Sequence, residues 1–238
     1  MKKYVVYCMT RNLYRMVVPS LKSLLAQNQI DKVFLLTEDD DVGFWLPDNV
    51  KVINVTNQQY FRKNGPNYNT KYTYMALMRI ALPFILPDVD MVLSLDLDTI
   101  VMGDLSELWD IPMKGKVIAG SIEPYLTEQK RYNYINFGVV MLNLKEMRDG
   151  TANRLIWLLN EEEYLYPEQD CVNEEIPEDR KVILSNAYNF SPFSGDAICI
   201  PKIIHFAAFG AERFKEQEIV CQWGAKPWDE VLEHGGGS

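Results

Sequence analysis

The segment Met91–Leu108, MVLSLDLDTIVMGDLSEL, decides how this chain is expected to fold. Its first five residues, Met91–Leu95, are apolar apart from one serine and predict a buried β-strand. Asp96 and Asp98 follow, where the strand should end. Carboxylates hold Mg²⁺ or Mn²⁺ together with substrate phosphates, and α/β sheets bind their ligands at strand ends. The segment therefore indicates an α/β protein with a cation site for a nucleotide diphosphate.

Strand and helix patterns alternate on both sides of this segment. Apolar runs predict strands over 4–9, 33–36 and 50–55 before it, and over 117–121, 139–144 and 202–206 after it. Helical spacing of apolar residues predicts helices over 14–26, 72–86 and 151–160. This β-α-β order predicts a mainly parallel central sheet with helices on both faces. No GxGxxG follows the first strand, so the usual glycine-rich dinucleotide site is not expected.

Length and composition narrow the class of protein. The chain has 238 residues, and we expect a single domain over 1–234, followed at 235–238 by GGGS, which resembles an artificial linker. A net charge of −9 argues against a nucleic-acid partner. The four cysteines form no CxxC pair and predict reduced thiols in a cytoplasmic protein. No apolar run is long enough to predict a membrane segment.

The two aspartates alone leave two interpretations open. In extended backbone, residues i and i+2 lie on one side, so Asp96 and Asp98 would face one cation. An isolated Asp-x-Asp is, however, more often a turn residue followed by a helix cap. Other segments of the chain decide between these interpretations.

The segment SLDLDTIVMGDLSELWD resembles the metal-binding segment of glycosyltransferase family 8, which includes glycogenin and the bacterial lipooligosaccharide galactosyltransferases. Five further segments resemble motifs of that family in the same order: YTYMALMR ending at Arg79, NFGVVMLNL at 136–144, EQDCVN at 168–173, IIHF at 203–206 and GAKPW at 224–228. The resemblance covers roughly residues 3–228. It implies the GT-A fold and retaining sugar transfer.

The resemblance implies that Asp96, Asp98 and His205 are the protein ligands of Mn²⁺, with Mg²⁺ possible. Two carboxylates and one imidazole leave coordination positions for two diphosphate oxygens, and imidazole favours Mn²⁺ over Mg²⁺. The alternative for His205 is a hydrogen-bonded histidine near a strand end.

Four residues are implied in catalysis. Lys226 would contact the diphosphate and stabilise its charge as the glycosidic bond breaks. Gln169 would lie near the anomeric carbon, beside Glu168, which replaces the usual aspartate of the family. The alternative for 168–170 is a helix N-terminus, where acidic residues are favoured. Arg79, on an otherwise apolar helix, would pair with Asp98 or a phosphate, or form a structural ion pair.

Further residues are implied in binding the sugar nucleotide. Those near the donor sugar and diphosphate are Arg79, Asp96, Leu97, Glu123, Asn136, Gly138, Gln169, Gly224 and Lys226. The family often has an acidic residue after the first strand, whereas this chain has Met9–Tyr14, MTRNLY. Thr10 or Asn12 would read the base edge here, and Tyr14 would stack on it. A second departure is the insertion at 207–223, expected to cover the donor or to form part of the acceptor site.

These observations predict a metal-dependent retaining glycosyltransferase that moves a hexose, glucose or galactose, from a UDP-sugar to a hydroxyl acceptor. Two alternatives remain open. One is a sugar-1-phosphate nucleotidyltransferase, although CMTRNLYR lacks the glycines of a phosphate loop. The other is a non-catalytic sugar-nucleotide or glycan-binding protein on the same fold.

Overall fold

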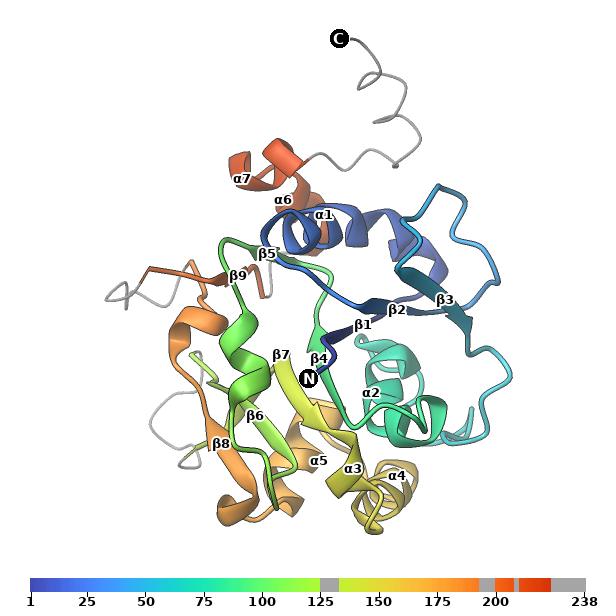
Figure 1. Cartoon of the computed structure of the whole chain (residues 1–238). Coiled ribbons are helices and arrows are strands. Elements are labelled where there is room, and N and C mark those ends of the chain that lie inside the picture. The colour runs from blue at the N-terminus through green and yellow to red at the C-terminus, as the bar shows by residue number, and fades with distance from the viewer. Residues whose placement is uncertain (125–132, 193–199, 208–209, 224–238) are drawn as a thin grey trace, which may run out of the picture.

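A seven-stranded sheet runs through the molecule in the order β3-β2-β1-β4-β7-β6-β8 (Figure 1). The structure is a computed structural model, which describes residues 1–124, 133–192, 200–207 and 210–223. The strands are β1 (Tyr4–Cys8), β2 (Lys32–Thr37), β3 (Val50–Asn54), β4 (Met91–Leu95), β6 (Ile118–Ile122), β7 (Ile135–Asn143) and β8 (Lys181–Ile183). Only β7 runs antiparallel to its two neighbours, β4 and β6. The predicted α/β class and mainly parallel sheet are confirmed.

Helices cover both faces of this sheet. α1 (Val17–Gln27) lies on one face, and α2 (Thr73–Ile85), α4 (Thr151–Glu161) and α5 (Pro167–Glu175) lie on the other (Figure 1). Because side chains alternate along a strand, each strand contributes to the apolar core on both faces. Val6 of β1 packs on the α2 side, whereas Val5 and Tyr7 pack on the α1 side. Burial on both faces explains why the strands are continuous apolar runs in the sequence.

A second, two-stranded sheet extends the α1 side. β5 (Thr99–Val101) pairs antiparallel with β9 (Ile203–His205), so that Thr99 lies opposite His205. Two short helices, α6 (Gly210–Lys215) and α7 (Glu218–Trp223), follow β9. Phe214 and Val220 of these helices pack with Ile100 and Phe206 in a small apolar cluster. The insertion expected at 207–223 contains these two helices, and they cover the two-stranded sheet.

The remaining elements are short. They are α3 (Leu144–Met147) and the 3-10 turns η1 (Arg11–Met16), η2 (Ser106–Asp110), η3 (Glu178–Arg180) and η4 (Asn186–Tyr188). Most predicted boundaries are within two residues of these elements. Two predictions need correction. The helix expected over 14–26 is the 3-10 turn η1 followed by α1, and the strand expected over 139–144 begins four residues earlier, at Ile135.

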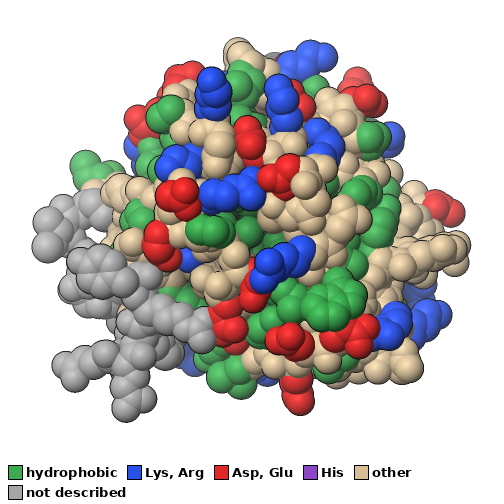
Figure 2. Space-filling model, turned by 90° about the horizontal axis from the view of Figure 1, so that it is seen from below, with side chains coloured by type: hydrophobic (Ala, Val, Ile, Leu, Met, Phe, Trp, Pro, Cys, Tyr) green, Lys and Arg blue, Asp and Glu red, His purple; other side chains and the backbone are tan. Residues whose placement is uncertain are grey.

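The outer surface carries mixed charge. Figure 2 shows one face, on which Lys and Arg side chains are interspersed with Asp and Glu, and neither sign dominates it. Exposed ion pairs such as Arg62–Glu161 and Arg154–Glu175 contribute to the mixed charge of the surface. Among the described residues, no helix combines the length and the apolar character needed to span a bilayer.

Candidate active site

Asp96 and Asp98 lie in the short turn that joins β4 to β5. A buried chain of hydroxyls fixes this turn: Thr99 Oγ1 donates to the Asp96 carbonyl (2.8 Å), and Ser20 Oγ of α1 lies 2.7 Å from Thr99 Oγ1. Tyr7 Oη, at 2.9 Å, completes the chain to Ser20. Because Thr99 donates to the carbonyl, Ser20 must donate to Thr99 and Tyr7 to Ser20.

His205 brings the third candidate ligand to this turn. It ends β9, and its Nε2 lies 3.3 Å from Asp98 Oδ1 and 3.6 Å from Asp96 Oδ2. The three ligand atoms lie within 4.8 Å of one another. Ligands at about 2.1 Å from an octahedral ion are roughly 3 Å apart, so the group fits a divalent cation after a small contraction. The structure therefore brings together all three predicted metal ligands.

The imidazole of His205 packs directly against the backbone of Gly138. A methyl group added at Gly138 would lie 2.5 Å from His205 Nδ1 and 2.7 Å from Nε2, which is well inside van der Waals contact. In addition, the Asp96 amide donates to the Gly138 carbonyl at 2.8 Å. The absence of a side chain at Gly138 thus makes room for the imidazole of the candidate ligand His205. The glycine of the NFGVVMLNL motif is needed for this close approach.

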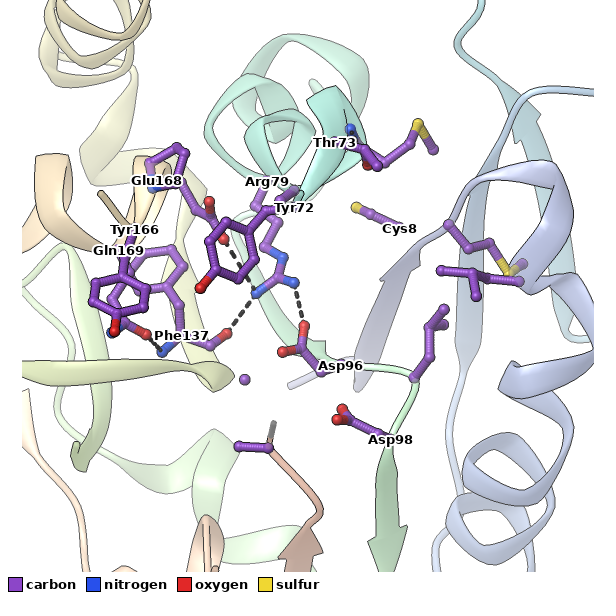
Figure 3. Close-up of a pocket in the computed structure, with 18 of the residues that line it drawn as sticks. Cys8, Tyr72, Thr73, Arg79, Asp96, Asp98, Phe137, Tyr166, Glu168 and Gln169 are labelled. Atoms are coloured by element: carbon purple, nitrogen blue, oxygen red, sulfur yellow. Dashed lines mark hydrogen bonds and ion pairs between the residues drawn. The ribbon is translucent and has the colours of Figure 1, made fainter. Parts of the chain in front are cut away.

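Arg79 of α2 lies beside the same group of ligands (Figure 3). Its Nη2 donates to Asp96 Oδ1, and its Nη1 donates to the Phe137 carbonyl (2.6 Å) and lies 3.9 Å from Glu168 Oε1. The pairing with Asp98 that was one alternative is therefore wrong, because the partner is Asp96. Arg79 leaves the other oxygen of Asp96, Oδ2, facing His205.

The charges around Arg79 are held in a buried environment. Burial alone would lower the pKa of Arg79, but Asp96 and Glu168 outweigh it and raise that pKa, so the guanidinium stays charged. Burial raises the pKa of Glu168, and this effect outweighs the opposing one of Arg79. Arg79 Nε has no hydrogen-bond partner among the described residues.

Gln169 is fixed at the start of α5 by contacts to β7 and to residues that flank β6 and β7. Its Oε1 accepts from the Phe137 amide at 2.8 Å, so its Nε2 must point the other way. That Nε2 lies 3.3 Å from Glu123 Oε2 and 3.3 Å from Tyr134 Oη. The alternative considered for residues 168–170, a helix N-terminus, is confirmed: Glu168 and Gln169 lie in the first turn of α5, and both line the cavity described next.

These residues surround a cavity of about 670 Å³. The predicted residues that line it are Thr10, Arg79, Asp96, Leu97, Asp98, Glu123, Asn136, Gly138, Glu168, Gln169 and His205. A cavity of this size is in the range that holds a small organic ligand or cofactor. Motifs that are distant in the sequence therefore line one binding site.

One rim of the cavity is aromatic, which the sequence analysis missed. The rings of Tyr72 and Tyr166 lie 5.9 Å apart and tilted by 53°, with Lys71 Nζ 4.8 Å from the Tyr72 ring centroid. Thr73, next in the chain, has a φ of 62°, unusual for a β-branched residue. The position of Tyr166, three residues before Gln169, was the signal available in the sequence.

The opposite end of the cavity, at the carboxyl end of β1, departs from the prediction. Thr10 lines the cavity, but its hydroxyl donates to Asn12 Oδ1 at 2.6 Å, and Asn12 is exposed outside the lining. Tyr14 belongs to the core, and its Oη accepts from the Glu38 amide and donates to Asp39. The expectation that Tyr14 stacks on a base is therefore wrong.

Acidic residues do lie near this end, but they directly follow β2. The Arg11 amide donates to Glu38 Oε2 at 2.8 Å, and Arg11 pairs with Asp39 at 2.6 Å. From the sequence, an acidic residue was expected only directly after the first strand, whereas these carboxylates follow the second. Two predicted residues, Gly224 and Lys226, lie outside the described part of the chain.

The pair of Asp98 and His205 carries complementary charge. Burial disfavours the charged form of His205, but Asp98 and Asp96 outweigh burial and raise its pKa above the usual 6.5. Burial by itself would raise the pKa of Asp98, but the effect of His205 outweighs burial and lowers that pKa below 3.8. Without a cation, the two side chains therefore form a buried ion pair over a range of mildly acidic pH.

This pair makes a pH-dependent contribution to stability in the metal-free protein. The raised pKa of His205 stabilises the fold fully below about pH 6.5, and this contribution is lost as pH rises through the folded-state value. The lowered pKa of Asp98 stabilises the fold above 3.8 and is lost as pH falls. We expect His205→Gln to reduce the free energy of unfolding more at about pH 5 than at about pH 9. Urea unfolding in EDTA measures the loss of unfolding free energy caused by His205→Gln at each pH. Equal losses at the two pH values would contradict the ion pair.

A family model described as glycosyl transferase family 8 matches residues 4–230. The chain belongs to glycosyltransferase family 8. The galactosyltransferase LgtC, solved with donor and acceptor sugar analogues, superposes on this family 8 chain with a TM-score of 0.71 at 20% identity, over 97% of this chain and 99% of LgtC. The glycosyltransferase GlyE of Streptococcus pneumoniae superposes with a TM-score of 0.70 at 21% sequence identity, over 98% of this chain and 63% of GlyE. The predicted GT-A fold is confirmed.

Curated relatives match over shorter stretches. Probable galacturonosyltransferase 12 of Arabidopsis thaliana is 37% identical over 79 residues, which are 31% of this family 8 chain and 14% of the plant protein. A putative glycosyltransferase of Haemophilus influenzae is 22% identical over 148 residues, 56% of this chain and 44% of that protein. The matches thus span less than half the length of either relative.

Proposed function

We propose that this protein is a metal-dependent, retaining glycosyltransferase that moves a hexose from a UDP-sugar to a hydroxyl acceptor. The observation that supports this most strongly is the group of Asp96, Asp98 and His205 at the wall of a cavity large enough for a sugar nucleotide. The family membership favours sugar transfer over the nucleotidyltransferase alternative. Glucose and galactose are the hexoses we would test first.

The three ligands fit a divalent cation, Mn²⁺ by preference, because imidazole joins two carboxylates. When bound, such a cation supplies charge stabilisation to the departing diphosphate. The chain prepares this site in advance: Arg79 holds one oxygen of Asp96, and the hydroxyl of Thr99 holds the turn. A preorganised site of this kind needs little rearrangement when the charge develops.

On the sugar side, we propose that Gln169 and Glu168 face the anomeric carbon and that Asn136 and Glu123 bind sugar hydroxyls. Gln169 is held on one side by the Phe137 amide, so its position is set before the donor binds. Arg79 keeps Glu168 close and charge-compensated in its buried position. Lys226, Gly224, Leu97 and Gly138 complete the proposed diphosphate contacts. The acceptor hydroxyl would lose its proton to a leaving phosphate oxygen.

The acceptor would lie at the aromatic rim of Tyr72 and Tyr166. Tyrosine rings present an apolar face and a hydroxyl at one edge, which suits the face of a sugar ring. Lys71 adds hydrogen-bond donors beside them. We also propose that residues 1–234 act as one catalytic domain, since strands from both halves of the chain share one sheet.

The test is release of UDP from a panel of UDP-hexoses, measured with Mn²⁺, with Mg²⁺ and with EDTA. We expect one UDP-hexose to be hydrolysed slowly without acceptor, and this release to stop in EDTA and to return when Mn²⁺ is added. GDP-mannose and ADP-glucose serve as controls for the base.

Other outcomes separate the alternatives. Mn²⁺-dependent UDP binding without release from any donor, with or without sugar acceptors, would favour a binding protein. Undiminished release in EDTA would contradict metal dependence while leaving sugar transfer intact. Pyrophosphate-dependent formation of UTP from a UDP-sugar would instead identify a nucleotidyltransferase.

A further inference from the structure

Asn189 lies directly behind the candidate metal ligand His205. It follows η4 and is 5% exposed, as is His205. The backbone of the next residue, Phe190, is tied to β9: its amide donates to the Ile203 carbonyl, and its carbonyl accepts from the His205 amide, both at 2.9 Å. Asn189 is therefore held beside His205 by the main chain, independently of its own side chain.

The Asn189 side chain joins His205 to the sugar side of the cavity. Its Oδ1 lies 2.8 Å from His205 Nδ1, and its Nδ2 donates to Asn136 Oδ1 at 2.7 Å. Asn136 Nδ2 in turn donates to Glu123 Oε2 at 2.6 Å. Four side chains thus form one hydrogen-bonded relay, and Asn136, like Asn189, is buried.

Two groups with fixed roles, the Gly138 amide as donor and the Glu123 carboxylate as acceptor, set the direction of the hydrogen bonds in this relay. The Gly138 amide can only donate, and it donates to Asn136 Oδ1 at 2.8 Å. The Glu123 carboxylate accepts, so the amide nitrogen of Asn136 must face it. Asn136 Oδ1 therefore accepts from Asn189 Nδ2. The amide oxygen of Asn189 consequently faces the imidazole.

This direction specifies the tautomer of His205. A carbonyl oxygen at 2.8 Å from Nδ1 requires the proton on Nδ1. The lone pair of the neutral ring then lies on Nε2, the atom that faces Asp98 Oδ1 and Asp96 Oδ2. Only this tautomer binds a cation at that position, and the partner of the other ring nitrogen normally fixes it.

We propose that Asn189 is a positioning residue that holds His205 in the Nδ1–H tautomer and so prepares Nε2 for the cation. This inference rests on the proposed metal site. It adds to that site a residue that touches neither the cation nor the sugar nucleotide, and that lies outside the motifs recognised in the sequence.

Three variants separate positioning from mere packing. Asn189→Leu keeps the branched shape of the side chain and removes both hydrogen bonds. Asn189→Asp keeps an acceptor for Nδ1–H and removes only the donor to Asn136. Asn186→Leu, three residues earlier and exposed, is the matched control. Urea unfolding of each variant in EDTA measures any change in stability separately.

The first readout is Mn²⁺ affinity, measured by the loss of the free-ion EPR signal. We expect Asn189→Leu to bind Mn²⁺ about 10–100-fold more weakly, as is usual when the hydrogen-bond partner of a ligand histidine is lost. Asn189→Asp and Asn186→Leu should stay close to the wild-type protein. Equal losses in both Asn189 variants would overturn the proposal, because the acceptor would then be irrelevant. Unchanged affinity in Asn189→Leu would overturn it as well.

The second readout needs no metal. The chain has only two histidines, so His234→Gln leaves His205 alone in a long-range ¹H–¹⁵N spectrum. At alkaline pH, where the ring is neutral, we expect the proton on Nδ1 in the otherwise wild-type protein and in Asn189→Asp, and on Nε2 in Asn189→Leu. A proton on Nε2 without a change at Asn189 would overturn the inference. If Mn²⁺ fails to bind the wild-type protein while the spectrum is as expected, the proposed metal site is wrong and the role of Asn189 in the tautomer still holds.

Discussion

Replacing Asp98 with asparagine is expected to reduce sugar transfer by about a thousandfold or more, the upper range seen when a charge-stabilising contact is removed from an active site. The substitution keeps the shape of the side chain and removes the negative charge that faces His205 Nε2 at 3.3 Å. An amide oxygen is a much weaker ligand for Mn²⁺ than a carboxylate, so the loss should fall on metal affinity and on the chemical step together.

Asp98 is a cleaner target than Asp96 for this experiment. Asp96 also accepts from Arg79, so its replacement would leave a buried guanidinium without its main partner. Steady-state transfer rates at increasing Mn²⁺ measure the effect of Asp98→Asn, and Asp110→Asn, at an exposed carboxylate, is the control. Wild-type rates and wild-type Mn²⁺ dependence in Asp98→Asn would refute the proposed metal site.

The second large effect is expected for Gly138→Ala. The added methyl group would lie within 2.7 Å of both ring nitrogens of His205, a separation that real side chains do not tolerate. The imidazole must therefore move, and its Nε2 leaves the neighbourhood of Asp98. We expect Mn²⁺ affinity to fall by at least about 100-fold and the free energy of unfolding to fall by about 1–3 kcal/mol.

A double-mutant cycle shows whether the imidazole is the cause. In a His205→Ala background the ring is absent, so Gly138→Ala should lose most of its effect on stability. Gly103→Ala, where an added methyl group meets nothing within 4 Å, is the matched control. Additive stability losses in the double variant would mean that the contact between Gly138 and His205 does not carry the effect.

The strand that precedes Asp96 and the alternation of strands and helices around it were predictable because a sheet buried on both faces requires continuous apolar runs. The same logic could not show that β7 runs antiparallel, since its apolar run has no direction. Asp96 and Asp98 were expected to converge through strand alternation, whereas the structure places both in a turn stabilised by Thr99. The prediction of convergence was right, and its physical reason was wrong.

Contacts between distant segments account for most of what the sequence did not reveal. Asn189 gives no signal of its own, because a buried asparagine is recognised only by its partners, His205 and Asn136. From the sequence, Tyr14 was expected to stack on the nucleotide base. Only the fold shows that the Glu38 amide and the Asp39 carboxylate hold its hydroxyl in place. The ion pair of Arg79 with Asp96 likewise depends on how α2 crosses the end of β4.

The pairing of β5 with β9 has a consequence for how the protein acquires its site. Thr99 and His205 are about a hundred residues apart along the chain, and joining segments so distant costs more loop-closure entropy than a local pairing does. Pairings of this kind form late or slowly compared with local ones such as β1 with β2. A chain released from synthesis before β9 is complete could fold much of the main sheet and would still lack its histidine ligand. Binding of the proposed cation would therefore report on completed folding, and the bound cation would favour the fully closed chain over partly folded forms.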